Sequence, residues 1–281
     1  GIVPVITGFQ GMNENGDITT LGRGGSDTTG VALAVALNAD ECQIYTDVDG
    51  IFTTDPRVCS KARLLKEVSF EEMLELSSSG AKVLQLRSVE YASKFNLPIR
   101  VLSSFNEGDG TLVQEEKNIM ERPIVSGISS IDTEAKLTIR GVPDVPGIAA
   151  KILSPISEAG IEVDVIVQNI SADNCTDFTF TVDKGDAENA KEILQKTSAS
   201  LGGGLVEVDH DIAKISVVGR GMRAHAGVAS KMFQALAKDE INISMITTSE
   251  IKISVVIKES EMKKAVTALH NAFDLDKELD S

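Results

Sequence analysis

The sequence predicts an α/β protein in which a part built from a sheet and helices precedes two copies of a smaller module. Apolar strand runs alternate with helical segments over residues 1–113, which is typical of a parallel sheet covered by helices. Residues 136–166 and 214–246 share one repeated pattern. At 281 residues, 42% of them hydrophobic, the chain is long and apolar enough for two domains.

The elements expected in the first part follow one another along the chain. Strands are expected at residues 2–7, 41–46 and 99–102, and helices at residues 28–38, 69–77 and 88–95. Turn residues at 107–111 and the polar stretch 114–121 then mark a boundary. We therefore expect the first domain to cover residues 1–113.

The second part contains an internal repeat, in which Gly147 corresponds to Gly227, 80 residues later. Each copy reads as strand, loop with glycine, helix, strand, strand and helix, and the first copy adds a strand at 205–208. A β-α-β-β-α-β unit without its last strand leaves an unpaired sheet edge.

The strand-like residues 124–130 precede the first copy, and we expect them to complete the second module, so that the two modules interleave. The alternative is a linker strand without such a role. The expected modules are residues 136–209, and residues 212–273 together with 124–130, within a second part spanning 124–281.

Composition excludes some classes of partner. A net charge of −15 argues against nucleic acid and anionic membranes, which attract basic surfaces. Cys42, Cys59 and Cys175 have no metal-binding spacing, so we expect no metal site and no disulfides, and a cytoplasmic location. Residues 31–37 form the longest apolar run, too short to span a bilayer. Because residues 2–6 already resemble a buried strand, we expect the chain to begin inside a longer polypeptide.

A glycine-rich loop at residues 20–29 precedes an apolar helix. Its glycines let the backbone approach an anion, and the helix N-terminus directs N–H groups at it. Arg23 can bind a carboxylate or phosphate bidentately. Ser26 and Asp27 add a hydroxyl and a carboxylate. The structural alternative is a glycine turn with a Ser or Asp cap.

Two further segments carry polar groups that suit a nucleotide. Residues 45–57 follow a predicted strand, and loops at the carboxyl ends of parallel strands are where ligands bind. The residues there that could serve a metal-bound nucleotide are Asp47, Asp49, Asp55 and Arg57. Lys82 follows Gly80 at a helix end. The alternatives are an acidic surface turn and a solvated lysine.

These three segments, in this order, resemble the aspartate kinases of the amino-acid kinase family. The motifs that carry the resemblance are residues 8–11, 20–27, 45–57, 70–76, 80–84, 87–92, 141–147 and 248–255. The resemblance covers nearly the whole chain. It implies the C-terminal part of an amino-acid kinase parallel-sheet domain, followed by two interleaved ferredoxin-like ACT domains.

The resemblance implies transfer of the γ-phosphoryl group of ATP, bound with Mg2+, to the β-carboxylate of aspartate. The product is 4-phospho-L-aspartate, on the route to lysine, threonine and methionine. Arg23 and Ser26 would hold aspartate, and Asp27 would be catalytic. The residues implied for the ATP site are Thr46, Asp47, Phe52, Arg57, Lys82 and Val83. Some relatives have tyrosine at the position of Phe52.

The repeated half is similar to paired ACT domains, which implies binding of lysine, threonine or both as effectors, and a homo-oligomer formed through these domains. One implied effector site comprises Asp144, Val145, Pro146, Gly147, Ile148, Ala149, Glu162, Val163, Asp164 and Gln168. The other comprises Val228, Ala229, Asn242, Ile243, Ser249 and Glu250. Relatives can have threonine where Ala229 stands. For Asp144 and Asn242, turn capping is the alternative.

One departure from the family pattern concerns the first strand, where the family has a lysine-glycine-glycine-threonine motif that this sequence does not contain. We therefore expect about the first third of the polypeptide to be missing, and this chain alone to have little activity. The alternative function, from another class, is a non-catalytic regulatory or assembly fragment that binds effector amino acids. Another amino-acid kinase is disfavoured, because the ACT pair would be out of place.

Overall fold

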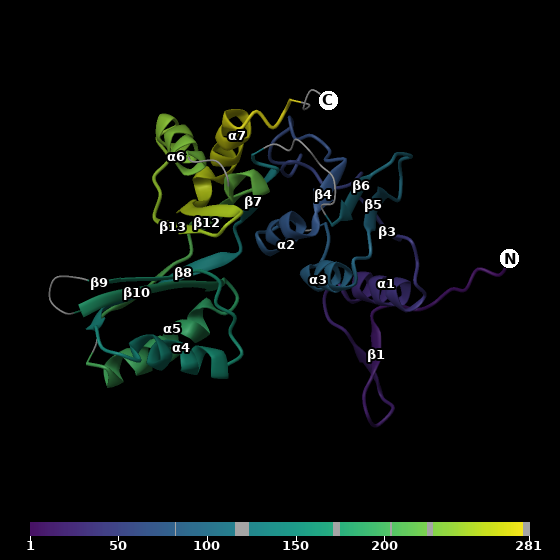
Figure 1. Cartoon of the computed structure of the whole chain (residues 1–281). Helices are drawn as coiled ribbons and strands as arrows, with labels where there is room; N and C mark the ends of the chain where they lie inside the picture. Colours follow the sequence, from purple (N-terminus) through teal and green to yellow (C-terminus); the bar gives the residue numbers. More distant parts are fainter. Residues whose placement is uncertain (82, 116–123, 171–174, 203, 224–226, 278–281) are drawn as a thin grey trace.

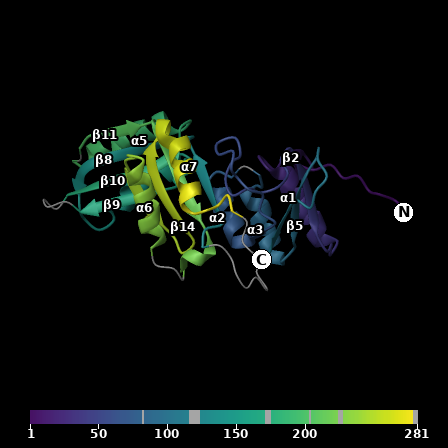
Figure 2. The same ribbon diagram turned by 90° about the horizontal axis from the view of Figure 1, so that it is seen from above.

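The computed structural model describes residues 1–281 except 82, 116–123, 171–174, 203, 224–226 and 278–281. Within the described residues the strands form three four-stranded sheets and one two-stranded hairpin. The kinase-like first part lies beside the two repeated modules, and its N-terminal residues extend away from the rest (Figures 1 and 2).

The first part has short strands and three helices among its described residues. They are β1 (Gln10–Met12), β2 (Ile18–Thr20), α1 (Gly25–Ala36), β3 (Cys42–Thr46), β4 (Glu67–Ser69), α2 (Phe70–Ser78), α3 (Leu86–Phe95), β5 (Ile99–Ser103) and β6 (Thr111–Gln114). Strands β4 and β6 had no counterpart in the sequence prediction.

The sheet of the first part is mixed, so the expectation of a parallel sheet is wrong in part. Its strand order is β3-β5-β6-β4, in which β3 is parallel to β5 and β4 to β6, while β5 and β6 are antiparallel. The reason is the short connection from Ser103 to Thr111. A parallel pair needs a crossover of a dozen or more residues, so β6 must return antiparallel.

The strand expected at residues 2–7 is also absent from the described structure. Ile2 is 96% exposed and Val5 94%, and no strand of the described sheets lies beside them to take their backbone hydrogen bonds. A strand needs such a neighbour to satisfy its N–H and C=O groups. The antiparallel β1–β2 hairpin, which pairs Gln10 with Thr20, follows instead.

The second part contains the two modules. The first module comprises β8 (Glu134–Pro143), α4 (Ile148–Glu158), β9 (Ile166–Ile170), β10 (Cys175–Asp183), α5 (Ala187–Ser200) and β11 (Val206–Asp209). The second comprises β12 (Ile212–Val218), η1 (Arg220–Arg223), α6 (Val228–Lys238), β13 (Met245–Thr248), β14 (Lys252–Lys258), η2 (Glu259–Glu261) and α7 (Met262–Ala272).

Strand β7 (Gly127–Ile131) precedes the first module but joins the sheet of the second. The two strand orders are β11-β8-β10-β9 and β13-β14-β12-β7, and all pairs are antiparallel. Strand β7 thus occupies the edge that β11 occupies in the first module, which confirms the interleaved arrangement expected from the repeat.

Both modules bury their helices against one face of the sheet. In α4 the buried residues Ile148, Ile152 and Ile156 recur every four positions. Val228, Met232 and Leu236 do the same in α6. This spacing gives each helix one apolar stripe, which packs on the sheet.

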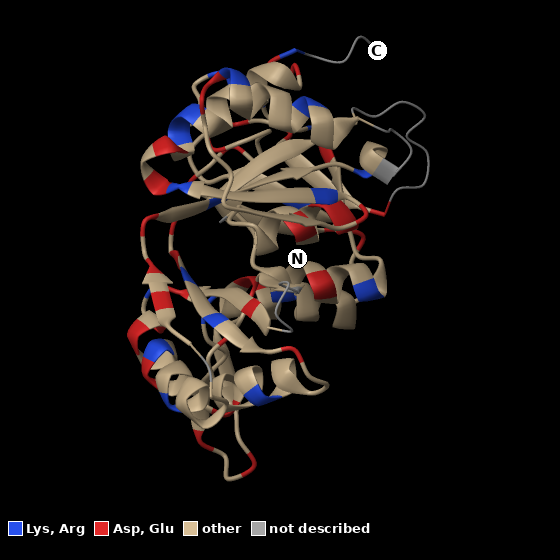
Figure 3. Cartoon of the chain, turned by 90° about the vertical axis from the view of Figure 1, so that its left-hand side faces the viewer, with Lys and Arg blue, Asp and Glu red and all other residues tan. Residues whose placement is uncertain are grey.

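Charged residues of both signs are interspersed over the described ribbons (Figure 3). Of the helices that the structure describes, none combines the length and the apolar character that crossing a membrane requires.

Candidate functional site

The glycine-rich loop forms the N-terminus of α1. Gly24 caps the helix with φ 76°, in the left-handed region that favours glycine. A Cβ atom on Gly24 would clash with the side chain of Gln85, and one on Gly25 would crowd Leu21 and Phe9. Glycine is therefore required here, and the loop packs closely on the segment that leads into α3.

Asp27 lies in the first turn of α1, partly buried beneath this contact. Burial raises the pKa of the Asp27 carboxyl group, and a hydrogen bond from the Gln85 backbone acts in the opposite direction. The helix dipole also favours a negative charge at this end of α1. Asp27 therefore joins α1 to the residue that directly precedes α3.

Arg23 and Ser26 both precede Asp27 and are both exposed. The hairpin side of the loop is held by Phe9, whose backbone N–H donates to Thr29 Oγ1 at 3.2 Å. The structure thus brings the three predicted aspartate-site residues together on one loop and turn. Two of them face solvent, where a ligand can reach them.

The second predicted loop begins where β3 ends. Thr46 Oγ1 donates to Asp47 Oδ1 at 3.2 Å. Farther along, the Ile51 N–H donates to Thr111 Oγ1 at 2.9 Å, and Phe52 bridges to Leu64. The loop therefore has an anchored base, while Asp47 stays exposed.

Arg57 lies at the far end of this loop and is 84% exposed. Its Nη2 lies 2.8 Å from Asp55 Oδ2, and its Nε lies 3.0 Å from Asp55 Oδ1. This hydrogen bonding raises the pKa of Arg57. A phosphate at Arg57 would have to share the guanidinium with Asp55, a contact that the sequence did not predict.

The third predicted segment is described in part. Lys82 lies outside the described residues, and Val83 is partly buried against the core of the first part. Gly80 has φ 105°, and its Cβ would lie 2.5 Å from the Ser130 carbonyl oxygen. The end of α2 is therefore packed on β7, a strand of the second module.

The residues of the first predicted effector site fall into two groups. Asp144 to Gly147 form the loop before α4, in which Gly147 adopts φ 86° with open space around it. Glu162 and Gln168 are exposed. Ile148 is buried in the core, so that only its backbone is accessible to a ligand.

Asp164, assigned to the same effector site, is already engaged by the second module. Its carboxylate pairs with Lys214 Nζ, which also lies 2.6 Å from Glu134 Oε1. The Lys214 side chain is only 4% exposed. Burial, the larger effect, raises the pKa of Glu134, and the Lys214 charge opposes it. These three residues form an ion cluster between the modules, in which Lys214 and Glu134 are buried and the Asp164 side chain is 51% exposed.

The second predicted effector site is likewise divided. Val228 is buried in the core of the second module, and the partly buried Ala229 and Ile243 pack against it. Asn242 and Glu250 are exposed. Ser249 Oγ donates to Glu75 Oε1 of α2 at 3.3 Å. Lys252 Nζ lies 2.8 Å from Glu75 Oε2. One effector candidate therefore touches the kinase-like part directly.

Glu72 was not predicted as functional, although its pattern with Ser69 is the sequence signature of a capping box. Its Oε2 accepts the Ser69 N–H at 3.1 Å. Its Oε1 accepts hydrogen bonds from Ser126 Oγ at 2.5 Å and from the Arg220 N–H at 3.4 Å. The helix cap could therefore be predicted from the sequence. No local sequence pattern indicates the contact with the second module.

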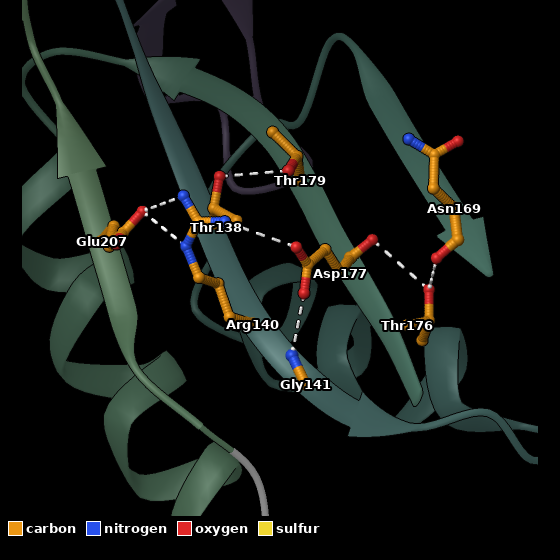
Figure 4. Close-up of polar contacts among 8 residues, drawn as sticks. All are labelled: Thr138, Arg140, Gly141, Asn169, Thr176, Asp177, Thr179 and Glu207. Atoms are coloured by element: carbon orange, nitrogen blue, oxygen red, sulfur yellow. Dashed lines mark hydrogen bonds and ion pairs between the residues drawn. The ribbon is translucent and has the colours of Figure 1, made fainter. Parts of the chain in front are cut away.

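A polar network lies on the sheet face of the first module that its helices do not cover (Figure 4). Arg140 bonds Glu207 at 2.8 Å and Asp177 at 3.4 Å. Asp177 Oδ1 accepts the Gly141 N–H at 2.9 Å, and Thr138 pairs with Thr179 at 3.0 Å. These polar groups therefore hydrogen-bond with one another, Arg140 on the exposed side and Thr138 in a buried position.

Comparison with known proteins agrees with this division of the chain. The sequence model of the amino acid kinase family matches residues 1–103, and models of the ACT domain match residues 137–201 and 215–273. An aspartokinase of Pseudomonas aeruginosa is 64% identical over 278 residues, which are 98% of this chain and 68% of that protein. The chain belongs to the aspartate kinase family.

Solved structures of the family have the same fold. E. coli aspartokinase III in complex with aspartate and ADP superposes with a TM-score of 0.80 at 31% identity, over 94% of this chain. The same enzyme with lysine and aspartate gives a TM-score of 0.75 at 30% identity, over 95% of this chain. The chain spans 59% of the length of either E. coli chain.

Proposed function

We propose that this chain is the aspartate- and nucleotide-binding portion of an aspartate kinase whose ACT domains bind lysine, threonine or both. The observation that carries the proposal is Asp27, placed at the N-terminus of α1 beside an exposed arginine and serine and bonded by the Gln85 backbone. In support, the E. coli relative is known in complex with aspartate and ADP, and with lysine.

In the proposed reaction, an oxygen of the aspartate β-carboxylate attacks the γ-phosphorus of ATP. The bond from that phosphorus to the β,γ-bridging oxygen breaks, and ADP leaves. Arg23 binds a carboxylate of aspartate through two parallel hydrogen bonds, and Ser26 adds a hydroxyl donor. Asp27 orients this loop through Gln85. Such a site works mainly by positioning its substrates and neutralising their charge.

The proposed ATP site comprises Thr46, Asp47, Phe52, Arg57, Lys82 and Val83. Magnesium in nucleotide sites takes one or two carboxylates together with phosphate oxygens. No group of three or more metal-binding side chains occurs among the described residues, but Asp47 is exposed and suits such a role. Asp47 would hold Mg2+, which neutralises charge on the phosphates when bound.

The proposed regulation places effector amino acids at the N-termini of α4 and α6, in a homodimer formed through the ACT domains. Gly147 and Gly227 leave open space at both helix N-termini, and backbone N–H groups there suit a carboxylate. A symmetric dimer is the commonest assembly among soluble homo-oligomers.

The test is a kinase assay on the full-length protein, with ADP release and trapping of the acyl phosphate by hydroxylamine as independent readouts. Arg23→Ala should raise the KM for aspartate by about 10- to 100-fold, the effect of a lost charged hydrogen-bond pair, and leave the KM for ATP near the parental value. Arg87→Ala, an exposed arginine on α3, is the matched control. Loss of ATP binding alone in Arg23→Ala would overturn the assignment of this loop to aspartate.

A further inference from the structure

His270 is a titratable residue buried at the boundary between the second module and the first part. It lies near the end of α7 and is completely buried. Its Nε2 is 2.9 Å from Thr53 Oγ1, and Thr53 is completely buried as well. A side chain of the ACT module therefore reaches the loop that follows β3.

Thr53 is the point where this loop meets three other segments. Its N–H donates to the Arg63 carbonyl at 2.8 Å, and its Oγ1 accepts the Arg63 N–H at 3.0 Å. Its carbonyl accepts the Ile128 N–H of β7 at 2.7 Å. The hydrogen bond to His270 adds α7, so two elements of the second module hold this one residue.

The position of Thr53 in the loop gives this contact a consequence for a ligand. Thr53 follows Phe52 directly and precedes Arg57 by four positions. The loop is also tied to β6 by Thr111. Because the base is fixed at two points, the exposed side chains at its ends are held in one arrangement, and loss of either point would loosen them.

We infer that His270 is a positioning residue for ATP: by holding Thr53 it fixes the loop from Thr46 to Arg57, and so links nucleotide binding to α7 of the second ACT domain. The inference rests on the proposed ATP-binding function of this loop.

The surroundings of His270 favour its neutral form, which suits a bond between two uncharged groups. Burial, the largest effect, lowers the pKa of His270, Lys61 and Arg63 act in the same direction, and Asp276 opposes them. Nδ1 has no hydrogen-bond partner within the part of the chain that the structure describes. A protonated ring would therefore bury a charge with one N–H unsatisfied.

The experiment measures KM for ATP and for aspartate on the full-length protein with His270→Leu, His270→Gln, Thr53→Val and the His270→Leu/Thr53→Val double variant. His270→Leu and Thr53→Val should each raise the KM for ATP by about threefold to tenfold, the effect of one neutral hydrogen bond, with the KM for aspartate near the parental value. Glutamine keeps a polar atom near Nε2, so His270→Gln should restore the KM for ATP. The double variant should show no further loss.

A parental KM for ATP in both single variants would overturn the inference, as would additive losses or an equal rise of both KM values. If His270→Leu does not fold, His270→Gln and the nearly isosteric Thr53→Val still decide the question. A parent protein without ATP-dependent phosphorylation of aspartate would overturn the proposed function and this inference together. An active parent with unchanged variants would overturn only the role of His270.

Discussion

The two ACT domains share one fold, but the sheet faces opposite their helices lie in different surroundings. In the first domain that face carries Arg140, which is 55% exposed, with Asp177 and Glu207 beside it. In the second domain every residue of β12 is buried. Val218 joins the core of the first part, and Ile212 packs with Val165 of the first domain. The repeated sheet face therefore presents Arg140 and its partners to solvent in one copy, whereas along β12 of the other copy it is buried against the first part and the first domain.

The corresponding lysines of the two copies illustrate how this difference arises. Lys136 is 21% exposed and pairs at 3.2 Å with Asp209 of its own sheet. Lys214, its counterpart in the repeat, is 4% exposed and pairs with Glu134 and Asp164 of the other domain. The same residue type at the same position is thus a surface charge in one domain and a connection between domains in the other.

The largest expected effect follows from removing these lysines in turn. Lys214→Met should lower the free energy of unfolding by about 3–5 kcal/mol, because it leaves the buried Glu134 carboxylate uncompensated. Lys136→Met should cost about 1 kcal/mol or less, as exposed pairs do. Urea denaturation of both variants checks the difference. Equal losses would show that Lys214 does not connect the domains as described.

A second pair compares adjacent glutamates of α2, the helix that packs on the second domain. Glu72→Gln should cost about 1–3 kcal/mol, because it weakens a buried carboxylate that joins the Ser69 cap to Ser126. Glu71 lies 3.5 Å from Arg220 with half of its side chain exposed, so Glu71→Gln should cost about 1 kcal/mol or less. Thermal unfolding of the two variants measures both losses of stability. A greater loss for Glu71→Gln would contradict the described contacts.

A third prediction concerns pH. Because burial lowers the pKa of His270 from its usual 6.5, the unfolded chain takes up this proton before the folded chain does. Stability should therefore fall as the pH drops below about 6.5, by up to about 1.4 kcal/mol per pH unit from this group. His270→Gln should remove this part of the slope. Identical pH profiles of unfolding for parent and variant would show that His270 does not contribute to the pH dependence of stability.

The smallest expected effect belongs to the open face of the first domain. Arg140→Ala removes two surface ion pairs, which should cost about 1 kcal/mol or less and leave the KM for ATP unchanged. A kinetic assay with a urea titration checks both values. A raised KM for ATP would mean that the first domain also influences the proposed nucleotide-binding loop of residues 46–57.

The features of the fold that local sequence patterns determine could be predicted from the sequence. Apolar residues at helical spacing located α4 and α6, and the 80-residue correspondence of Gly147 and Gly227 located the modules. Helix α1 begins at Gly25, before the expected residue 28, because glycine is a poor helix former and propensity alone places the start too late. The domain boundaries and the roles of the site residues stay predictions.

Contacts between distant segments could not be predicted. Thr53 and His270 are 217 positions apart, and no local sequence pattern around either residue predicts their contact. Asp164 shows the same limit, because its carboxylate was assigned to an effector and is bound by Lys214. Burial of that lysine depends on how the two domains pack, and the spacing of apolar residues along the chain does not predict that packing.

We infer that the second ACT domain, and not the first, holds the loop of residues 46–57, which is the proposed nucleotide-binding loop. Amide hydrogen exchange of residues 47–57 tests it most directly, in the full-length protein and in its His270→Leu and Arg140→Ala variants. In His270→Leu we expect faster exchange at Ile51 and Thr53, whose N–H groups are hydrogen-bonded at the base of the loop. In Arg140→Ala we expect parental exchange. Parental exchange in His270→Leu, or equal acceleration in both variants, would contradict it.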